Sequence, residues 1–147
     1  MNDWQTNLVE DSDRIRAIAR DAKRVAVLGI KPESQISQPA FYVPQYLARA
    51  GVTIIPVPVY YPDVTHILGV PVHRKLADVE PPIDIVNVFR RPGDIPPHVD
   101  DILAAKPRVV WLQSGIRNDA VAEQLARAGI AVVQDRCLMV EHRSAAR

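Results

Sequence analysis

The amino-acid sequence predicts an α/β fold in which helices cover both faces of a doubly wound, mostly parallel sheet of five to six strands. Two observations lead to this prediction. Short apolar runs alternate along the chain with segments of helical periodicity, and that order is typical of parallel sheets. The runs are apolar at successive positions, as expected for strands buried on both faces. The length of 147 residues fits one domain, which we expect to comprise residues 1–147.

The first third of the chain is predicted to form two helix–strand pairs. Apolar side chains recur at helical spacing over residues 11–22, and the continuous apolar run at residues 24–30 follows as the first strand. A second helix is expected over residues 42–50, with Pro44 in its first turn because proline is tolerated only there. Residues 52–55 are the second predicted strand.

The middle of the chain, residues 56–82, is rich in proline. Because proline disrupts helix interiors, these prolines exclude a long helix. We expect turns and extended segments here, with a short edge strand at residues 70–72 and a weak helix around residues 76–79.

The rest of the chain returns to regular alternation. The predicted elements are a strand at residues 83–89, a helix at 97–105, a strand at 108–112, a helix at 118–128, a strand at 130–133 and a short C-terminal tail. Since crossovers between parallel strands are right-handed, a doubly wound, Rossmann-like sheet is the leading topology, with its core over residues 24–141.

Composition excludes several classes of partner and compartment. Lys and Arg number 18 and Asp and Glu 17, so no overall field attracts nucleic acid or a membrane surface. No apolar run approaches the ~18 residues that span a bilayer. Residues 1–20 lack the apolar stretch of a signal peptide. These features predict a cytoplasmic protein, and a single cysteine, Cys137, excludes an intrachain disulfide.

Familiar catalytic and nucleotide motifs are missing. Gly29 is not followed by the glycines of a dinucleotide fingerprint, and the second strand does not end in the acidic residue that holds a ribose, which disfavours NAD. Ser114 does not lie in the G-x-S-x-G motif of hydrolases. We therefore expect no catalytic residues. An enzyme that uses Cys137, beside Arg136, or a carboxylate such as Glu141 remains the alternative.

The ligand site is expected beyond the carboxyl ends of the strands, where strand order reverses. Four segments qualify: residues 29–38, 56–61, 89–94 and 113–118. Gly29 allows a phosphate to approach the backbone, and Arg90 and Arg91 supply cations beside Phe89. Two plainer interpretations stay open: both arginines are solvated charges, and the Gln-Ser-Gly turn after the fourth strand is purely structural.

Sequence stretches spread over almost the whole predicted core also match a known pattern. They are residues 25–29, 39–43, 46–47, 55–57, 67–69, 84–90, 110–116 and 133–141. In this order they resemble the small stand-alone CoA-binding proteins, whose fold is similar to the CoA-binding domain of the succinyl-CoA synthetase α subunit. The most specific stretches are those around Phe89-Arg90, Trp111-Leu-Gln113 and Asp135-Arg-Cys137.

The resemblance implies a site for coenzyme A or an acyl-CoA, made by residues from all four strand ends. The backbone at Gly29, Ile30 and Lys31 would approach the pyrophosphate. The adenosine side would be flanked by Val57 and Pro58, the middle lined by Val88, Phe89 and Arg90, and the site completed by Gln113, Ser114, Gly115 and Ile116.

The sequence also departs from the family pattern. The family usually has Asn and Pro where Pro58 and Val59 stand, and often has arginine at the place of Gln38. If those groups contact phosphate, weaker CoA affinity or another nucleotide-like ligand is expected. The resulting hypothesis is a non-catalytic binder of CoA or acyl-CoA, with no nucleic-acid or membrane partner. An acyl-CoA-handling enzyme and a CoA-sensing regulatory module are the alternatives.

Overall fold

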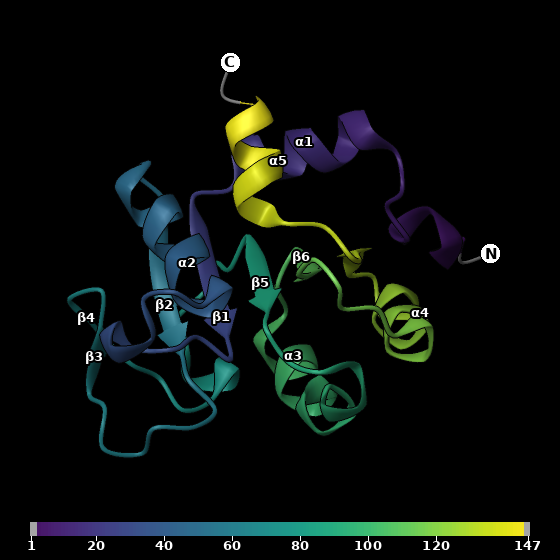
Figure 1. Ribbon diagram of the computed structural model, residues 1–147. Helices are drawn as coiled ribbons and strands as arrows, with labels where there is room; N and C mark the ends of the chain where they lie inside the picture. Colours follow the sequence, from purple (N-terminus) through teal and green to yellow (C-terminus); the bar gives the residue numbers. More distant parts are fainter. Residues whose placement is uncertain (1–2, 146–147) are drawn as a thin grey trace.

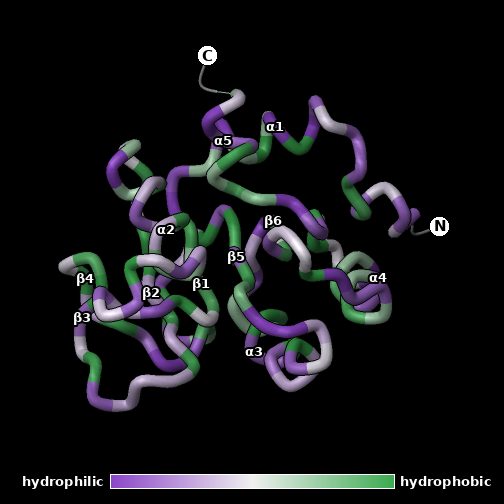
Figure 2. Tube along the Cα trace, viewed as in Figure 1, coloured by the Kyte–Doolittle hydropathy of each residue, from purple (hydrophilic) through white to green (hydrophobic). Residues whose placement is uncertain are grey.

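The computed structural model describes residues 3–145, which form a five-stranded parallel sheet in the order β2-β1-β5-β6-β7 (Figure 1). The strands are β1 (Arg24–Leu28), β2 (Thr53–Val57), β5 (Ile85–Val88), β6 (Val109–Leu112) and β7 (Ala131–Val133). The predicted doubly wound α/β fold is confirmed. All five strands are short, and nearly every residue in them is buried, most of them apolar, as expected for strands covered on both faces (Figure 2).

Helices cover both faces of the sheet. One face packs against α1 (Ser12–Asp21), α2 (Pro39–Arg49) and α5 (Leu138–Ala145). The other packs against the 3-10 helix η3 (Leu76–Asp78), α3 (Val99–Ala105) and α4 (Asp119–Arg127). Successive strand residues alternate between these two apolar clusters, so each strand contributes to both.

Strand order reverses between β1 and β5. The chain leaves β1 through α2 and pairs β2 on one side of β1, then returns to place β5 on the other side. Leu28, the last residue of β1, therefore lies between Val57 and Val88, the last residues of its two neighbours. Loops leaving β1 and β5 in opposite directions open a crevice at this point, which is where open α/β sheets bind ligands.

The expected edge strand at residues 70–72 does not join the main sheet. Val70–Pro71 is β4, and it pairs antiparallel with β3 (His66–Ile67) in a separate two-stranded sheet. The connecting residues Leu68 and Gly69 have positive φ, as tight hairpin turns require. The hairpin is still fastened to β2, because the His73 N–H donates to the Pro56 carbonyl at 2.9 Å.

Helix α2 begins at Pro39, three residues before its predicted start, and Pro44 consequently lies inside it. Pro44 has no N–H to donate to the carbonyl four residues earlier, which belongs to Ala40. That carbonyl instead accepts the Lys31 N–H at 3.1 Å. The proline thus creates an acceptor that ties the loop after β1 to α2.

The predicted C-terminal tail is wrong, because residues Leu138–Ala145 form α5. Its first N–H, from Leu138, donates to the side-chain oxygen of Gln113 at 3.3 Å, and the segment before it accepts the Trp111 indole N–H at the Arg136 carbonyl (2.8 Å). At the other end, the 3-10 helix η1 (Trp4–Asn7) leads to a bridge beside β7. Within residues 3–145, no helix combines the length and apolarity needed to cross a membrane.

The remaining predicted elements differ only in detail. The weak helix at residues 76–79 is the 3-10 helix η3. The helix predicted at residues 97–105 begins as the 3-10 helix η5 (Pro96–His98) and continues as α3, and another 3-10 helix, η4 (Pro92–Asp94), precedes it. These short turns carry the chain from β5 past the crevice.

Candidate functional site

A cavity of about 300 Å³ lies at the reversal point, between the loops that follow β1, β2 and β5. Its lining residues are Gly29, Ile30, Lys31, Val59, Tyr60, Tyr61, Phe89, Arg90, Arg91 and Asp94. Three cations face one carboxylate in this set, so the lining favours an anionic ligand. Three of the four segments expected from strand ends meet here.

Gly29 holds the β1 and β5 loops in close contact. Its φ is +87°, and a Cβ atom at this position would lie 2.4 Å from the Phe89 carbonyl oxygen. The Gly29 N–H donates to the Val57 carbonyl and the Phe89 N–H to the Leu28 carbonyl, each at 2.9 Å. Only glycine fits both this conformation and this contact.

The backbone of residues 29–31 offers fewer donors than the sequence indicated. The N–H groups of Gly29 and Lys31 already donate to the Val57 and Ala40 carbonyls. Ile30 is the residue of the three whose N–H has no acceptor among residues 3–145, while its side chain is buried. A phosphate contact through this loop therefore falls to the Ile30 N–H.

Arg90 is held from two sides. Its Nε donates to Nε2 of His98 at 3.2 Å, and its Nη1 donates to the Tyr60 hydroxyl at 3.4 Å. The guanidinium carbon also lies 5.4 Å from the centre of the Tyr60 ring, within cation–π range. Since a guanidinium has five N–H donors, three have no acceptor within the part of the chain that the structure describes.

Two more cations border the cavity. Lys31 is half-buried and Arg91 is exposed, and neither makes an ion pair among the described residues. Tyr60 adds an aromatic surface, with 64% of the residue exposed. A ring with an open surface beside unpaired cations is suited to a ligand that carries both an aromatic base and phosphate groups.

Comparison with known proteins gives the family. A protein-family model described as "CoA binding domain" matches residues 23–143 of this chain. The chain belongs to the CoA-binding domain family. The uncharacterised protein YneT of Bacillus subtilis (strain 168) is 34% identical to it over 128 residues, which cover 87% of this chain and 91% of YneT.

Solved structures agree with this CoA-binding domain fold. The structure of cell-free ID.343 from Thermus thermophilus is 40% identical, has a TM-score of 0.83, and aligns over 92% of this chain and 99% of that one. A dinucleotide-forming acetyl-coenzyme A synthetase from Ca. Korarchaeum cryptofilum shares the fold, with a TM-score of 0.64 at 17% identity. The match covers 83% of this chain but 27% of the synthetase.

Several residues that the family resemblance assigned to the ligand do not line the cavity of this CoA-binding domain. Val57 and Val88 are 1% and 0% exposed and belong to the apolar cluster under the crevice, and Pro58 is also buried. Val57 and Val88 contribute to the loop structure through their backbone carbonyls: the Val57 carbonyl accepts the Gly29 N–H, and the Val88 carbonyl accepts the Gln113 N–H. These three positions support the loops that reach the cavity.

The turn of residues 113–116 is held by hydrogen bonds within the protein. Gln113 is 4% exposed, and its side-chain oxygen accepts from Asn87 and from the first N–H of α5, each at 3.3 Å. The Gly115 N–H donates to Asp135 at 2.6 Å, and the Ile116 N–H donates to the Gln113 carbonyl. Ser114 and Gly115 are exposed, yet none of the four residues lines the cavity.

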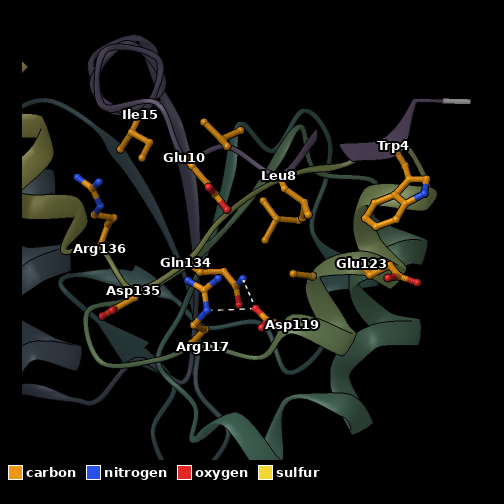
Figure 3. A pocket seen from close by; sticks show the side chains of 13 residues that line it. Trp4, Leu8, Glu10, Ile15, Arg117, Asp119, Glu123, Gln134, Asp135 and Arg136 are labelled. Atoms are coloured by element: carbon orange, nitrogen blue, oxygen red, sulfur yellow. Dashed lines mark hydrogen bonds and ion pairs between the residues drawn. The ribbon is translucent and has the colours of Figure 1, made fainter. Parts of the chain in front are cut away.

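A second cavity of about 430 Å³ lies beside β7, between α4 and the N-terminal segment (Figure 3). Both of its arginines are in ion pairs: Arg117 contacts Asp119 at 3.1 Å, and Arg136 contacts Glu141 at 3.5 Å. Gln134 also donates to the Asp119 carboxylate at 3.1 Å. Although it is larger, this cavity is away from the point where strand order reverses. The smaller cavity, with its unpaired cations, is therefore the better candidate site of the CoA-binding domain.

Sequence reasoning missed the side chains that organise the site. Tyr60 and Tyr61 lie in the expected segment after β2 and Asp94 lies in the segment after β5, but none of them was singled out. His98 was not singled out either, yet it is half-buried and accepts a hydrogen bond from Arg90. The pKa of His98 is lowered, first by burial and then by Arg90, against the opposing effect of Asp101 and Asp94. A single sequence carries no signal for such a contact.

Proposed function

We propose that the chain binds coenzyme A or an acyl-CoA in the cavity at the β1–β5 crevice. The observation that carries this proposal is the Arg90 guanidinium, which is fixed at the crevice with three N–H donors uncommitted. Membership of the CoA-binding domain family supports the choice of ligand. The ligand's phosphates would face Arg90, Lys31, Arg91 and the Ile30 N–H.

The chemistry of the cavity fits the phosphorylated part of CoA. CoA carries a pyrophosphate, a 3′-phosphate and an adenine ring. Charge-assisted hydrogen bonds from a planar guanidinium suit phosphate oxygens, and an exposed tyrosine ring such as Tyr60 offers a stacking surface for a base. The pantetheine arm, which has no charge to neutralise, would run outward along the molecular surface.

We further propose that binding, and not catalysis, is the function of this site. Among residues 3–145, those lining the cavity include no Ser, Cys, Thr or His, and Asp94 is their one carboxylate. That set lacks the Ser, Cys or Thr nucleophile with a His base on which many acyl-transfer enzymes rely. Cys137 and Glu141 belong to the segment around α5 and are not among the lining residues. The proposed activity is therefore to hold the CoA ligand, in the manner of a carrier or sensor.

The melting temperature of the chain tests this proposal. With CoA at about 100 times its Kd, binding stabilises the folded state by about 2.7 kcal/mol. At roughly 2–4 °C per kcal/mol for a domain of this size, the melting temperature should rise by about 5–10 °C. Acetyl-CoA should act similarly, whereas pantetheine, which lacks phosphate, should have little effect. No shift with either CoA or acetyl-CoA at millimolar concentration would contradict the proposal.

A further inference from the structure

We infer that His98 is the residue that positions Arg90 for an anionic phosphate ligand, and that it does so only as a neutral imidazole. Protonation of His98 then releases Arg90 and weakens binding of the ligand. This inference rests on the proposed function for its ligand. It makes His98 a positioning residue, since His98 itself does not line the cavity.

The first support is the geometry around Arg90. His98 accepts from Nε at one side of the guanidinium, and the Tyr60 hydroxyl accepts from Nη1 at the other. Two acceptors on different nitrogens of a planar group fix its orientation, which a single contact would leave free to rotate. The remaining N–H groups of Arg90 therefore keep a fixed orientation as long as His98 and Tyr60 both accept from it.

The second support is the rigidity of the turn that carries His98. His98 ends the Pro-Pro-His turn η5, and its N–H donates to the Ile95 carbonyl at 2.8 Å. Ile95 and Val99, on either side of the turn, are 0% and 3% exposed and belong to the apolar cluster under the crevice. Prolines at the two preceding positions restrict the backbone further. The imidazole is therefore placed by packed structure rather than by a mobile loop.

The third support is the protonation state that the contact requires. Arginine is always protonated and can only donate, so Nε2 of His98 must carry no proton. The charged groups facing His98 are Arg90 from the β5 loop, Asp94 from η4 and Asp101 from α3. Asp101 is already committed, since it accepts the Leu76 and Ala77 N–H groups at 2.7 and 2.9 Å. Burial and Arg90 outweigh the two carboxylates and lower the pKa of His98, which is consistent with a neutral imidazole near pH 7.

The direction of the pH effect follows. Because the pKa of His98 in the folded chain lies below its ordinary value of 6.5, His98 is neutral above that value and gains a proton only at lower pH. The proton occupies the nitrogen that accepts from Arg90 and places a second positive charge beside the guanidinium. Both effects disrupt the contact, so affinity for the ligand falls as the pH decreases through the pKa of His98 in the folded chain, which lies below 6.5.

The test compares CoA affinity at pH 7.5 and 5.5, measured by titration calorimetry, for the unmodified chain, H98A and H98Q. Glutamine places an acceptor near the position of Nε2 but does not titrate. H98A should bind CoA roughly fivefold more weakly than the unmodified chain at pH 7.5, the loss of about one hydrogen bond. H98Q should recover most of that loss. H66Q, which removes the exposed histidine of β3, controls for generic loss of an imidazole.

Acidification separates the possible roles of His98. As the pH falls from 7.5 and His98 gains its proton, the unmodified chain and H66Q should lose more affinity than H98Q, by about five- to tenfold once His98 is fully protonated; titration of the ligand's own phosphate cancels from this ratio. Equal pH profiles for the unmodified chain and H98Q, over a pH range in which the His98 ring resonances show that it gains its proton, would overturn the inference. So would tighter binding by the unmodified chain at pH 5.5, which would make protonated His98 a direct ligand contact.

A ligand-free measurement separates failure of this inference from failure of the proposed function. The Nε–H resonance of Arg90 should exchange slowly with solvent at pH 7.5 in the unmodified chain and in H98Q, and rapidly in H98A. If the resonance behaves in this way but CoA does not bind, the proposed function fails while the positioning of Arg90 by His98 stands. If the resonance is the same in all three proteins, the positioning fails whatever the ligand.

Discussion

Replacing Gly29 by alanine is expected to lower the free energy of unfolding by roughly 2–5 kcal/mol, through backbone strain and a steric clash. The strain arises because the φ of +87° is unfavourable for any residue with a Cβ. The clash arises because that Cβ would lie 2.4 Å from the Phe89 carbonyl oxygen, and backbone on both sides prevents an easy shift. Urea unfolding followed by circular dichroism measures the loss.

Gly115 supplies a matched control for this substitution. Its φ of +83° is nearly the same, but none of the described residues other than its chain neighbours has an atom within 4 Å of the Cβ that alanine would add. G115A should therefore show the cost of the backbone conformation alone, on the order of 1 kcal/mol. Equal losses of stability in G29A and G115A would show that the contact between the β1 and β5 loops is not as close as described.

Replacing Arg90 by alanine is expected to weaken CoA binding by about 10- to 100-fold, the equivalent of about 1–3 kcal/mol for a hydrogen bond to a charged group. The loss comes from the removal of the one lining cation that is fixed by two acceptors. Titration calorimetry at pH 7.5 measures it. R90K should recover only part of the affinity, because an ammonium group cannot bond His98, Tyr60 and a phosphate in the same planar arrangement.

Arg108 provides the control for a change in net charge. It lies just before β6, at the amino-terminal edge of the sheet and hence opposite the crevice, and 78% of its side chain is exposed. R108A removes the same charge as R90A and should leave CoA affinity within about twofold of the unmodified chain. If R90A and R108A bind equally well, Arg90 is an ordinary surface charge and the site has been placed wrongly.

The main features of the fold were predictable from local patterns. Apolar runs predicted all five strands of the sheet, because strands buried on both faces need apolar residues at most positions. Predictions failed where a single residue was interpreted in isolation. Pro44 was expected in a first turn, but it lies inside α2, because the Ala40 carbonyl that it leaves without a helical donor accepts the N–H of Lys31, a residue outside the helix. α5 was missed because only Leu138 and Glu141 of its eight residues are buried, too few to produce a periodic pattern.

The candidate site was predictable in location but less so in detail. The reversal of strand order follows from topology, so the loops carrying Gly29, Phe89 and Arg90 were expected to meet, and they do. The sequence does not reveal which donors are already used. The Lys31 N–H is committed to Ala40, and the side chain of Gln113 caps α5. Those contacts depend on tertiary packing, which no motif encodes.

The location of CoA binding is tested most directly by titrating the ¹⁵N-labelled chain with CoA and following its amide resonances. The two cavities supply separate sets of probes. The N–H groups of Ile30, Tyr60 and Arg90 report on the β1–β5 crevice, and the Trp4 indole and Gln134 report on the cavity beside β7. We predict saturable shifts in the first set and unchanged positions in the second. Shifts confined to the second set, or none in either set at millimolar CoA, would contradict the assignment of a CoA site to the crevice.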